Sequence, residues 1–190
     1  MAITLQITAL SKTFNQLLFE NINISLAGNA RIGLIGDNGC GKSTLLKMMA
    51  STSTTPLPPP NLGGGGSSET EVVLPSSGNI NWSSGVQIGY LAQEIDDELD
   101  SLSGGEKKII KLAQLFYGGY DVLLLDEPDN HLDIEHREWF SQMVSDFAGI
   151  VVIISHDRKF LRQSTDHIWH MEENKLRAYD YGYEKFRDIY

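Results

Sequence analysis

The sequence predicts an α/β fold with a mainly parallel sheet flanked by helices. Dense apolar runs of strand length, among them RIGLIG (31–36), DVLLLD (121–126) and GIVVIIS (149–155), alternate along the chain with segments of helical periodicity. Such runs are typical of strands covered on both faces, and the alternation is typical of parallel strands joined by crossover helices. ITLQIT (3–8) and INISLA (22–27) instead alternate apolar and polar residues, which indicates half-buried strands in an N-terminal antiparallel part.

Each predicted strand is a short run that is either continuously apolar or alternates apolar and polar residues. In chain order these runs are 3–8, 22–27, 31–36, 78–82, 86–93, 121–126, 149–155, 167–171 and 175–179. The last two are expected to form a closing hairpin.

Helices are expected in the segments that follow most of the apolar strands. Their predicted ranges are 42–50, 104–117, 134–147, 157–163 and 183–190. In the second of these, Ile109, Leu112, Ala113 and Phe116 fall on one face, as the amphipathic pattern of a surface helix requires.

Length and composition indicate one globular domain, residues 1–190, with an ordinary core. The net charge of −10 argues against general DNA binding, because phosphate backbones attract basic surfaces. Cys40 is the only cysteine, so neither a disulfide framework nor a thiolate zinc site is expected. The longest apolar stretch, 148–154, is too short to cross a bilayer, and no leader pattern opens the chain. We therefore expect a soluble cytoplasmic protein with no membrane insertion.

Residues 51–70, STSTTPLPPPNLGGGGSSET, are rich in Pro, Gly, Ser and Thr. This composition predicts a flexible insertion on the surface. A linker with no further role is the simplest interpretation.

GDNGCGKS (36–43) matches the phosphate-binding loop of P-loop NTPases, with a predicted strand before it and a predicted helix after it. Its glycines permit the torsions through which backbone N–H groups converge on phosphates. Lys42 is expected to reach the β- and γ-phosphates, and the Ser43 hydroxyl to ligate Mg²⁺. Cys40 is interpreted as a small residue tolerated in the loop rather than as a redox group. The predicted nucleotide-binding residues of this segment are Gly36, Asn38, Gly39, Cys40, Gly41, Lys42, Ser43 and Thr44.

LLLDEP (123–128) places two acids at the C-terminal end of an apolar strand, where ligands of open α/β sheets bind. Asp126 can hold the Mg²⁺ shell, and Glu127 is placed to orient and polarise an attacking water. The alternative is a simple helix N-cap cluster. His156, in IISHDRKFL, also ends a buried strand, and its position favours contact with the γ-phosphate over a structural role.

Together these segments resemble the ATP-binding cassette (ABC) domain. Its motifs occur in the family's order: the P-loop, Gln93 after GYLA, LSGGE (102–106), LLLDEP, DNHLD (129–133) and SHD (155–157). The resemblance implies a P-loop NTPase with an ABC-type nucleotide-binding fold, ATP as substrate and Mg²⁺ as cofactor.

The resemblance also assigns roles to single residues. Gln93 resembles the Q-loop residue that senses Mg²⁺ and the attacking water, and Asp133 resembles the D-loop acid at the interface of two cassettes. Phe14, in SKTFNQ, resembles the aromatic residue that stacks on adenine, although a core position is the alternative. Ser103, Gly104 and Gly105 resemble the signature that closes over the nucleotide of a partner cassette. The implied partner is therefore a second ABC cassette, either a copy of this chain or a different one.

Within the family, DEPDNHLD followed by SHDRKFL resembles the ABC-F class of twin-cassette ATPases, many of which act on ribosomes. The ribosome is therefore a further implied partner. The tail YDYGYEKFRDIY resembles the stretch that leads into the linker between the two cassettes of that class. Asp129 departs from the pattern, because Thr is commoner at this position.

The segment between Gln93 and the signature is the main departure from the family. ABC domains insert a helical subdomain of several dozen residues there, whereas this chain has only EIDDELDS (94–101). Five of these eight residues are acidic, which predicts a short solvated strap in place of a packed subdomain.

Three functions remain open from the sequence. The first is an ABC-F-like ATPase that forms composite sites with a second cassette. The second is a nucleotide-binding module, or a truncated half-protein, that does not hydrolyse ATP. The third is the ATP-binding subunit of an ABC transporter, which the absence of the helical subdomain disfavours because transporter cassettes dock their membrane partners through it.

Overall fold

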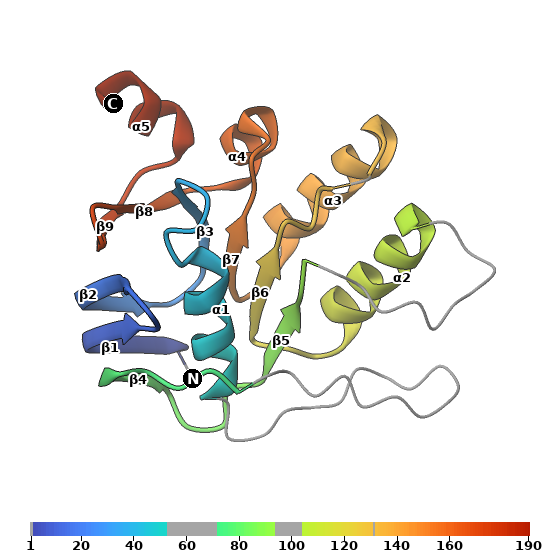
Figure 1. Cartoon of the computed structure of the whole chain (residues 1–190). Helices are drawn as coiled ribbons and strands as arrows, with labels where there is room; N and C mark the ends of the chain where they lie inside the picture. The colour runs from blue at the N-terminus through green and yellow to red at the C-terminus, as the bar shows by residue number, and fades with distance from the viewer. Residues whose placement is uncertain (1, 53–71, 94–103, 131) are drawn as a thin grey trace.

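The structure is a computed structural model that describes residues 2–52, 72–93, 104–130 and 132–190. These residues form a three-stranded sheet of order β2-β1-β4 and a six-stranded sheet of order β5-β6-β7-β3-β8-β9. Figure 1 shows the larger sheet between two layers, with α1 and the smaller sheet on one side and α2 and α3 on the other. The predicted α/β class with an N-terminal antiparallel part is confirmed.

The smaller sheet is antiparallel throughout and consists of β1 (Thr4–Thr13), β2 (Leu17–Ala27) and β4 (Ser77–Trp82). The predicted runs 3–8 and 22–27 were too short, because each strand extends past an irregularity. Ala9 and Asn21 have positive φ angles of 47° and 49°, and the register shifts between Ile7 and Leu10. A bulge of this kind breaks the two-residue alternation by which a strand is detected.

The larger sheet has a parallel centre made of β5 (Ile88–Leu91), β6 (Val122–Asp126), β7 (Ile150–Ile154) and β3 (Ala30–Gly36). Strand β8 (His167–Glu172) continues it in parallel, and β9 (Lys175–Tyr179) closes it as an antiparallel hairpin with β8. All residues of β6 and β7 are buried, as their uninterrupted apolar sequences predict.

Five helices lie within the described residues, and all five begin within one residue of the predicted positions. They are α1 (Lys42–Ser51), α2 (Gly104–Tyr117), α3 (Ile134–Asp146), α4 (Arg158–Ser164) and α5 (Tyr183–Ile189). On α2, Leu112 is buried, and Ile109 and Phe116 pack against the core from partly buried positions. The amphipathic face predicted for this helix is thus the face that contacts the sheet.

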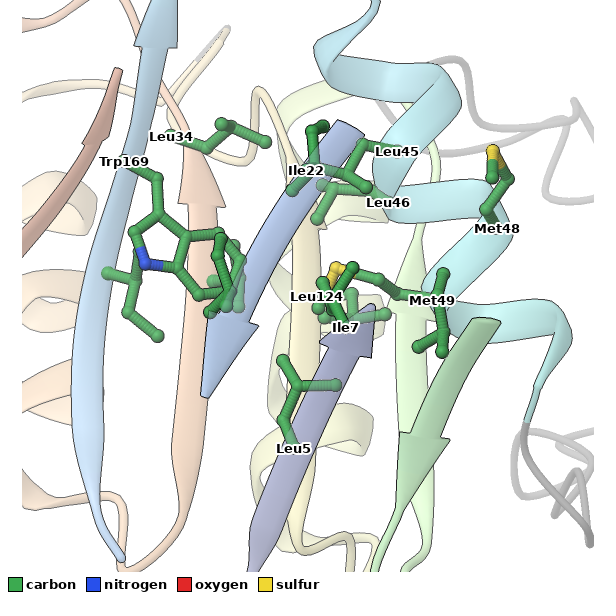
Figure 2. Close-up of a cluster of buried hydrophobic side chains, with 14 of the residues drawn as sticks. Leu5, Ile7, Ile22, Leu34, Leu45, Leu46, Met48, Met49, Leu124 and Trp169 are labelled. Carbon is green, nitrogen blue, oxygen red and sulfur yellow. The ribbon is translucent and has the colours of Figure 1, made fainter. Parts of the chain in front are cut away.

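Alternate residues of the parallel strands pack into two separate hydrophobic cores, one on each face of the sheet. Leu124 and Val152 belong to a core shared with α1 and the antiparallel sheet, whereas Leu125 and Val151 belong to a core shared with α2 and α3. Figure 2 shows Ile7 of β1 and Ile22 of β2 beside Leu45, Leu46 and Met49 of α1, and Leu5 and Met48 belong to the same core. Packing on both faces of the sheet holds the C-terminal ends of β6 and β7 in place. The candidate site lies at these ends.

The two unusual segments of the sequence fall mainly outside the described residues. Of the predicted insertion 51–70, Ser51 is the last residue of α1 and Thr52 caps that helix, while the remainder lies outside. The predicted strap, 94–101, and Ser103 also lie outside the described residues. In the part of the chain that is described, no helix has the length and apolar character needed to span a membrane.

Candidate nucleotide-binding site

The phosphate-binding loop joins β3 to α1 in the way that the sequence predicts. Gly36 has a φ angle of 147°, and a Cβ atom at this position would lie 2.3 Å from the carbonyl oxygen of Met171. Gly41 has a φ angle of 105° at the N-cap of α1, and its Cβ would lie 3.0 Å from the Phe19 ring. Both positions therefore require glycine for torsion and for space.

Lys42 turns back over this loop from the start of α1. Its Nζ donates hydrogen bonds to the carbonyl oxygens of Gly36, at 2.8 Å, and Asp37, at 2.9 Å. The side chain is only 7% exposed, so the loop itself fixes the direction of the ammonium group. A cation held beside backbone N–H groups and a helix N-terminus suits a polyphosphate.

A cavity of about 380 Å³ opens over the loop. It brings together residues from β2, the loop, the end of β5, the end of β6 and the end of β7. The lining residues are Leu18, Asn38, Gly39, Gly41, Lys42, Ser43, Thr44, Gln93, Glu127 and Ile154. Six of the predicted nucleotide-binding residues and two predicted catalytic residues thus line one cavity, whereas Gly36, Cys40 and His156 are not in its lining.

Asp126 ends β6 and lies 2% exposed beside Ser43. Burial raises the pKa of its carboxyl group, while a hydrogen bond with Ser43 acts in the opposite direction. Its Oδ1 is buried and has no hydrogen-bond partner among the described residues, and the same holds for the nearby hydroxyl of Tyr90. An unpaired carboxylate oxygen beside a hydroxyl fits Mg²⁺, which takes one or two protein oxygens and keeps waters and phosphate oxygens as its other ligands.

Glu127, the residue after Asp126, has a backbone conformation that is rare for a residue with a side chain. Its φ angle is 48°, in the left-handed region that costs about 1–2 kcal/mol. Its N–H donates to the carbonyl of Ile154 at 3.0 Å, and its own carbonyl accepts from Lys108 Nζ at 2.5 Å. Contacts from β7 and α2 therefore hold this strained residue in place.

Three side chains hold the carboxylate of Glu127 at the cavity. Gln93 Nε2 donates to Oε2 at 2.9 Å, and Asn130 Nδ2 donates to the same oxygen at 2.5 Å. His156 Nε2 lies 3.5 Å from Oε1. The predicted residues Gln93 and His156 thus both contact Glu127, although the three come from separate segments.

Four residues of the site were missed by the sequence analysis as site residues: Leu18, Lys108, Asn130 and Ile154. Asn130 and Ile154 lie inside or directly before recognised motifs, so closer attention to DNHLD and to the residue before SHD would have found them. Leu18 reaches the cavity only through the docking of the antiparallel sheet, for which the sequence holds no signal.

Asp129, the departure from the family pattern, is buried just below Glu127. Its Oδ2 accepts a hydrogen bond from Ser155 Oγ at 2.8 Å, whereas its Oδ1 has no partner among the described residues. Burial raises the pKa of its carboxyl group, and the positive charge of Lys108 opposes that rise. The acid is therefore part of a buried polar group that includes Lys108.

Phe14, Asp133, Gly104 and Gly105 are not among the residues that line the cavity. Phe14 is 58% exposed in the β1–β2 hairpin, which excludes the alternative of a core position, and it does not line the cavity. Asp133 is the N-cap of α3, where its Oδ1 accepts from the His136 N–H at 2.9 Å. Gly104 and Gly105 open α2. Their roles in adenine stacking, in the D-loop and in the signature stay predictions.

Comparison with known families gives a match to the family model described as ABC transporter. The match covers residues 19–58 and 69–130, which together make up more than half of the chain. The matched region includes the P-loop, Gln93, the LSGGE signature and the Asp126–Glu127 pair.

Relatives with similar sequences include ABC-F proteins. The ABC transporter F family member 5 of Arabidopsis thaliana is 31% identical, with 89% of this chain and 28% of that protein covered. The ribosome protection protein VmlR of Bacillus subtilis is 32% identical, with coverage of 92% and 32%. The probable ATP-binding protein YheS of Escherichia coli K12 is 27% identical, with coverage of 91% and 30%. The chain thus spans about a third or less of the length of these relatives, and the resemblance to the ABC-F class is confirmed.

Among solved structures, a metal-chelate type ABC transporter in an inward-facing conformation matches with a TM-score of 0.72. The match covers 94% of this chain and 83% of the other chain at 17% sequence identity. At this identity the likeness concerns the fold, and it confirms the ABC-type nucleotide-binding architecture.

Proposed function

The chain belongs to the ABC transporter family, and from this premise we propose that it binds Mg-ATP in the cavity over the P-loop and hydrolyses it. The relatives of ABC-F type support ATP binding by a cassette of this kind. The observation that carries the proposal is the meeting of Lys42, Ser43, Gln93 and Glu127 on one cavity. A phosphate cradle and a carboxylate for water activation then face the same space.

In the proposed reaction, the triphosphate lies along the loop from Gly39 to Thr44, with Lys42 beside its β- and γ-phosphates. Glu127 accepts a hydrogen bond from a water molecule and takes its proton as the water oxygen forms a bond to the γ-phosphorus. The bond from that phosphorus to the bridging oxygen breaks, which leaves ADP and phosphate. Gln93 and His156 orient the Glu127 carboxylate by the contacts described above.

Ser43, Asp126 and Gln93 are the proposed residues of the magnesium site. The bound ion would supply neutralisation of the charge on the phosphate oxygens. No three His, Cys, Asp or Glu side chains cluster as a metal site within the described residues, so the site depends on oxygens brought by the nucleotide and water.

A composite site with a second cassette is a further part of the proposal, and the place of α2 supports it. None of the described residues that line the cavity comes from α2, although Gly104 and Gly105 open that helix with backbone N–H groups suited to a phosphate. The two described glycines of the signature are therefore not part of the lining of the chain's own cavity. We propose that the signature closes over the nucleotide of a partner, either a copy of this chain or a different cassette.

The work that the hydrolysis drives is also a proposal. VmlR is named as a ribosome protection protein, and its similarity over 92% of this chain supports a ribosome as partner and a cytoplasmic location. Co-sedimentation of the purified chain with ribosomes, with and without Mg-ATP, tests this part separately. Absence of the chain from the ribosomal pellet under both conditions would remove it.

Phosphate release by the purified chain tests the hydrolysis itself, with Lys42→Ala as the blank. We expect Glu127→Gln to lower hydrolysis by about 10²–10⁴-fold, since it removes the proton acceptor, while ATP binding persists. The same variant in saturating Mg-ATP should elute from a sizing column as a dimer. Wild-type release at the level of the blank would leave a nucleotide-binding module without turnover, and a Glu127→Gln protein that stays monomeric would remove the site shared with a second copy of this chain.

A further inference from the structure

Lys108 is a buried lysine outside the motifs that define the family. It lies on α2 with 3% of its side chain exposed, and its Nζ donates to the carbonyl oxygen of Glu127 at 2.5 Å. Lysine is almost never fully buried unless its charge has partners. The position of Lys108 therefore points to a role at Glu127.

Three acids interact electrostatically with this ammonium group. Burial lowers the pKa of Lys108, and the negative charges of Asp129, Glu127 and Asp126 oppose that effect. Lys108 therefore supplies positive charge from α2 to the acids at and after the end of β6. It does not line the cavity itself.

Lys108 contacts the backbone of Glu127 at its carbonyl group, and the backbone conformation there sets the direction of the Glu127 side chain. At a φ angle of 48°, Glu127 persists only if its neighbours hold it there. Its N–H is held by the carbonyl of Ile154, and its carbonyl is held by Lys108 and, more weakly, by the Asn130 N–H at 3.4 Å. Loss of the Lys108 bond would leave the carbonyl with only the long contact.

We infer that Lys108 is a positioning residue for Glu127, whose carbonyl it holds so that the carboxylate faces the cavity. This inference rests on the proposed function, because it assumes that the Glu127 carboxylate activates water for ATP hydrolysis. Lys108 lies four residues, or about one helical turn, after Gly104. The first turns of α2 thus carry the signature glycines at one end and, one turn later, the lysine that bonds the backbone carbonyl of Glu127.

The test compares Lys108→Met, Lys108→Arg and Lys111→Met in the full chain. Lys111 is on the same helix and is not among the described residues that line the cavity, so its substitution is a matched loss of charge. We expect Lys108→Met to lower the kcat for ATP by about tenfold to a hundredfold with the KM for ATP unchanged, because misplacement affects the chemical step rather than binding. Lys108→Arg retains a charged donor and should restore most of the rate, and Lys111→Met should equal the wild type.

A second readout needs no turnover. The Glu127 amide is hydrogen-bonded to Ile154, so its hydrogen exchange reports the conformation directly. We expect exchange in the 122–130 segment to be at least tenfold faster in Lys108→Met than in Lys111→Met. If Lys108→Met does not fold because Asp129 is left without a nearby cation, Lys108→Met with Asp129→Asn is compared with Asp129→Asn alone.

Equal exchange rates in the two lysine variants would overturn the inference. So would a rise in KM with kcat unchanged. A wild-type chain that releases no phosphate would instead contradict the proposed hydrolysis, while the exchange comparison would still decide whether Lys108 holds Glu127.

Discussion

The phosphate loop and the turn at Glu127 face the same cavity but are held in place in different ways. In the loop, left-handed torsions fall on glycines, and the one long side chain, Lys42, bonds back to the loop carbonyls of Gly36 and Asp37. In the turn, a left-handed torsion falls on Glu127, which is held by contacts from other segments. The loop is thus specified locally, whereas the turn depends on the assembled fold.

This difference has a physical reason. A phosphate is bound by backbone N–H groups, so the loop needs torsions rather than side chains, and glycine supplies them at little cost. The proposed water activation would need a carboxylate at one position, which gives a reason for a side chain where glycine would be less strained.

Gly36→Ala should have the largest effect on stability, because its Cβ would lie 2.3 Å from the Met171 carbonyl oxygen in addition to a left-handed torsion. We expect a loss of about 3 kcal/mol in the free energy of unfolding, measured by urea denaturation. Gly39→Ala is the matched control, since nothing lies within 4 Å of its Cβ and only the torsion at φ 80° is strained. Equal losses in the two variants would show that space does not matter at Gly36.

Asp133→Ala tests how the segment 127–133 is anchored at its C-terminal end, where it joins α3. Asp133 caps α3, and loss of its bond to the His136 N–H should lower the free energy of unfolding by about 1 kcal/mol. Asp133→Asn can keep the cap and should remain close to the wild type in the same urea titration. A normal Asp133→Ala stability would mean that the carboxylate is not needed for the helix.

The strain at Glu127 can be isolated by comparing Glu127→Gly with Glu127→Ala. Both variants lose the carboxylate, but only alanine retains the cost of the left-handed torsion. The glycine variant should be the more stable of the two by about 0.5–1 kcal/mol in urea, the strain being partly offset by the greater entropy of glycine in the unfolded chain. An alanine variant at least as stable as the glycine variant would contradict the interpretation of this torsion as strain.

The pH dependence of Asp126 should give the smallest effect. Because burial raises its pKa above 3.8, the folded state disfavours the ionised form, and this contribution to stability falls as pH rises through the raised pKa. Without Mg²⁺ and nucleotide, Asp126→Asn should therefore gain in urea midpoint relative to the wild type between pH 4 and pH 7.5. A gap that stays constant over this range would contradict the direction of the shift.

Most of the fold could be predicted from the sequence because each buried strand has a short, continuously apolar sequence. The run 149–155 became β7, Ile150–Ile154, with only its ends trimmed. The antiparallel strands were less predictable, since the irregularities at Ala9 and Asn21 interrupt the alternation that marks a half-buried strand.

The candidate site divides in the same way. Lys42, Ser43, Asp126 and Glu127 lie in local motifs whose chemistry is tied to their spacing, and three of the four line the cavity while Asp126 lies buried beside Ser43. Lys108 was not predicted as part of the site, because a lysine near the start of a helix is usually solvated and only the fold shows that this one is buried. Nor does any local pattern indicate that Glu127 has a left-handed torsion.

The close approach of Gly41 to Phe19 has a consequence for how nucleotide affinity could evolve. Phe19 is fully buried in β2, outside every nucleotide-binding motif, yet its ring lies where a side chain at Gly41 would be. The antiparallel sheet therefore packs directly against the N-terminus of α1. Substitutions in the hydrophobic packing of that sheet can therefore alter the affinity for a nucleotide without any change in the residues that line the cavity.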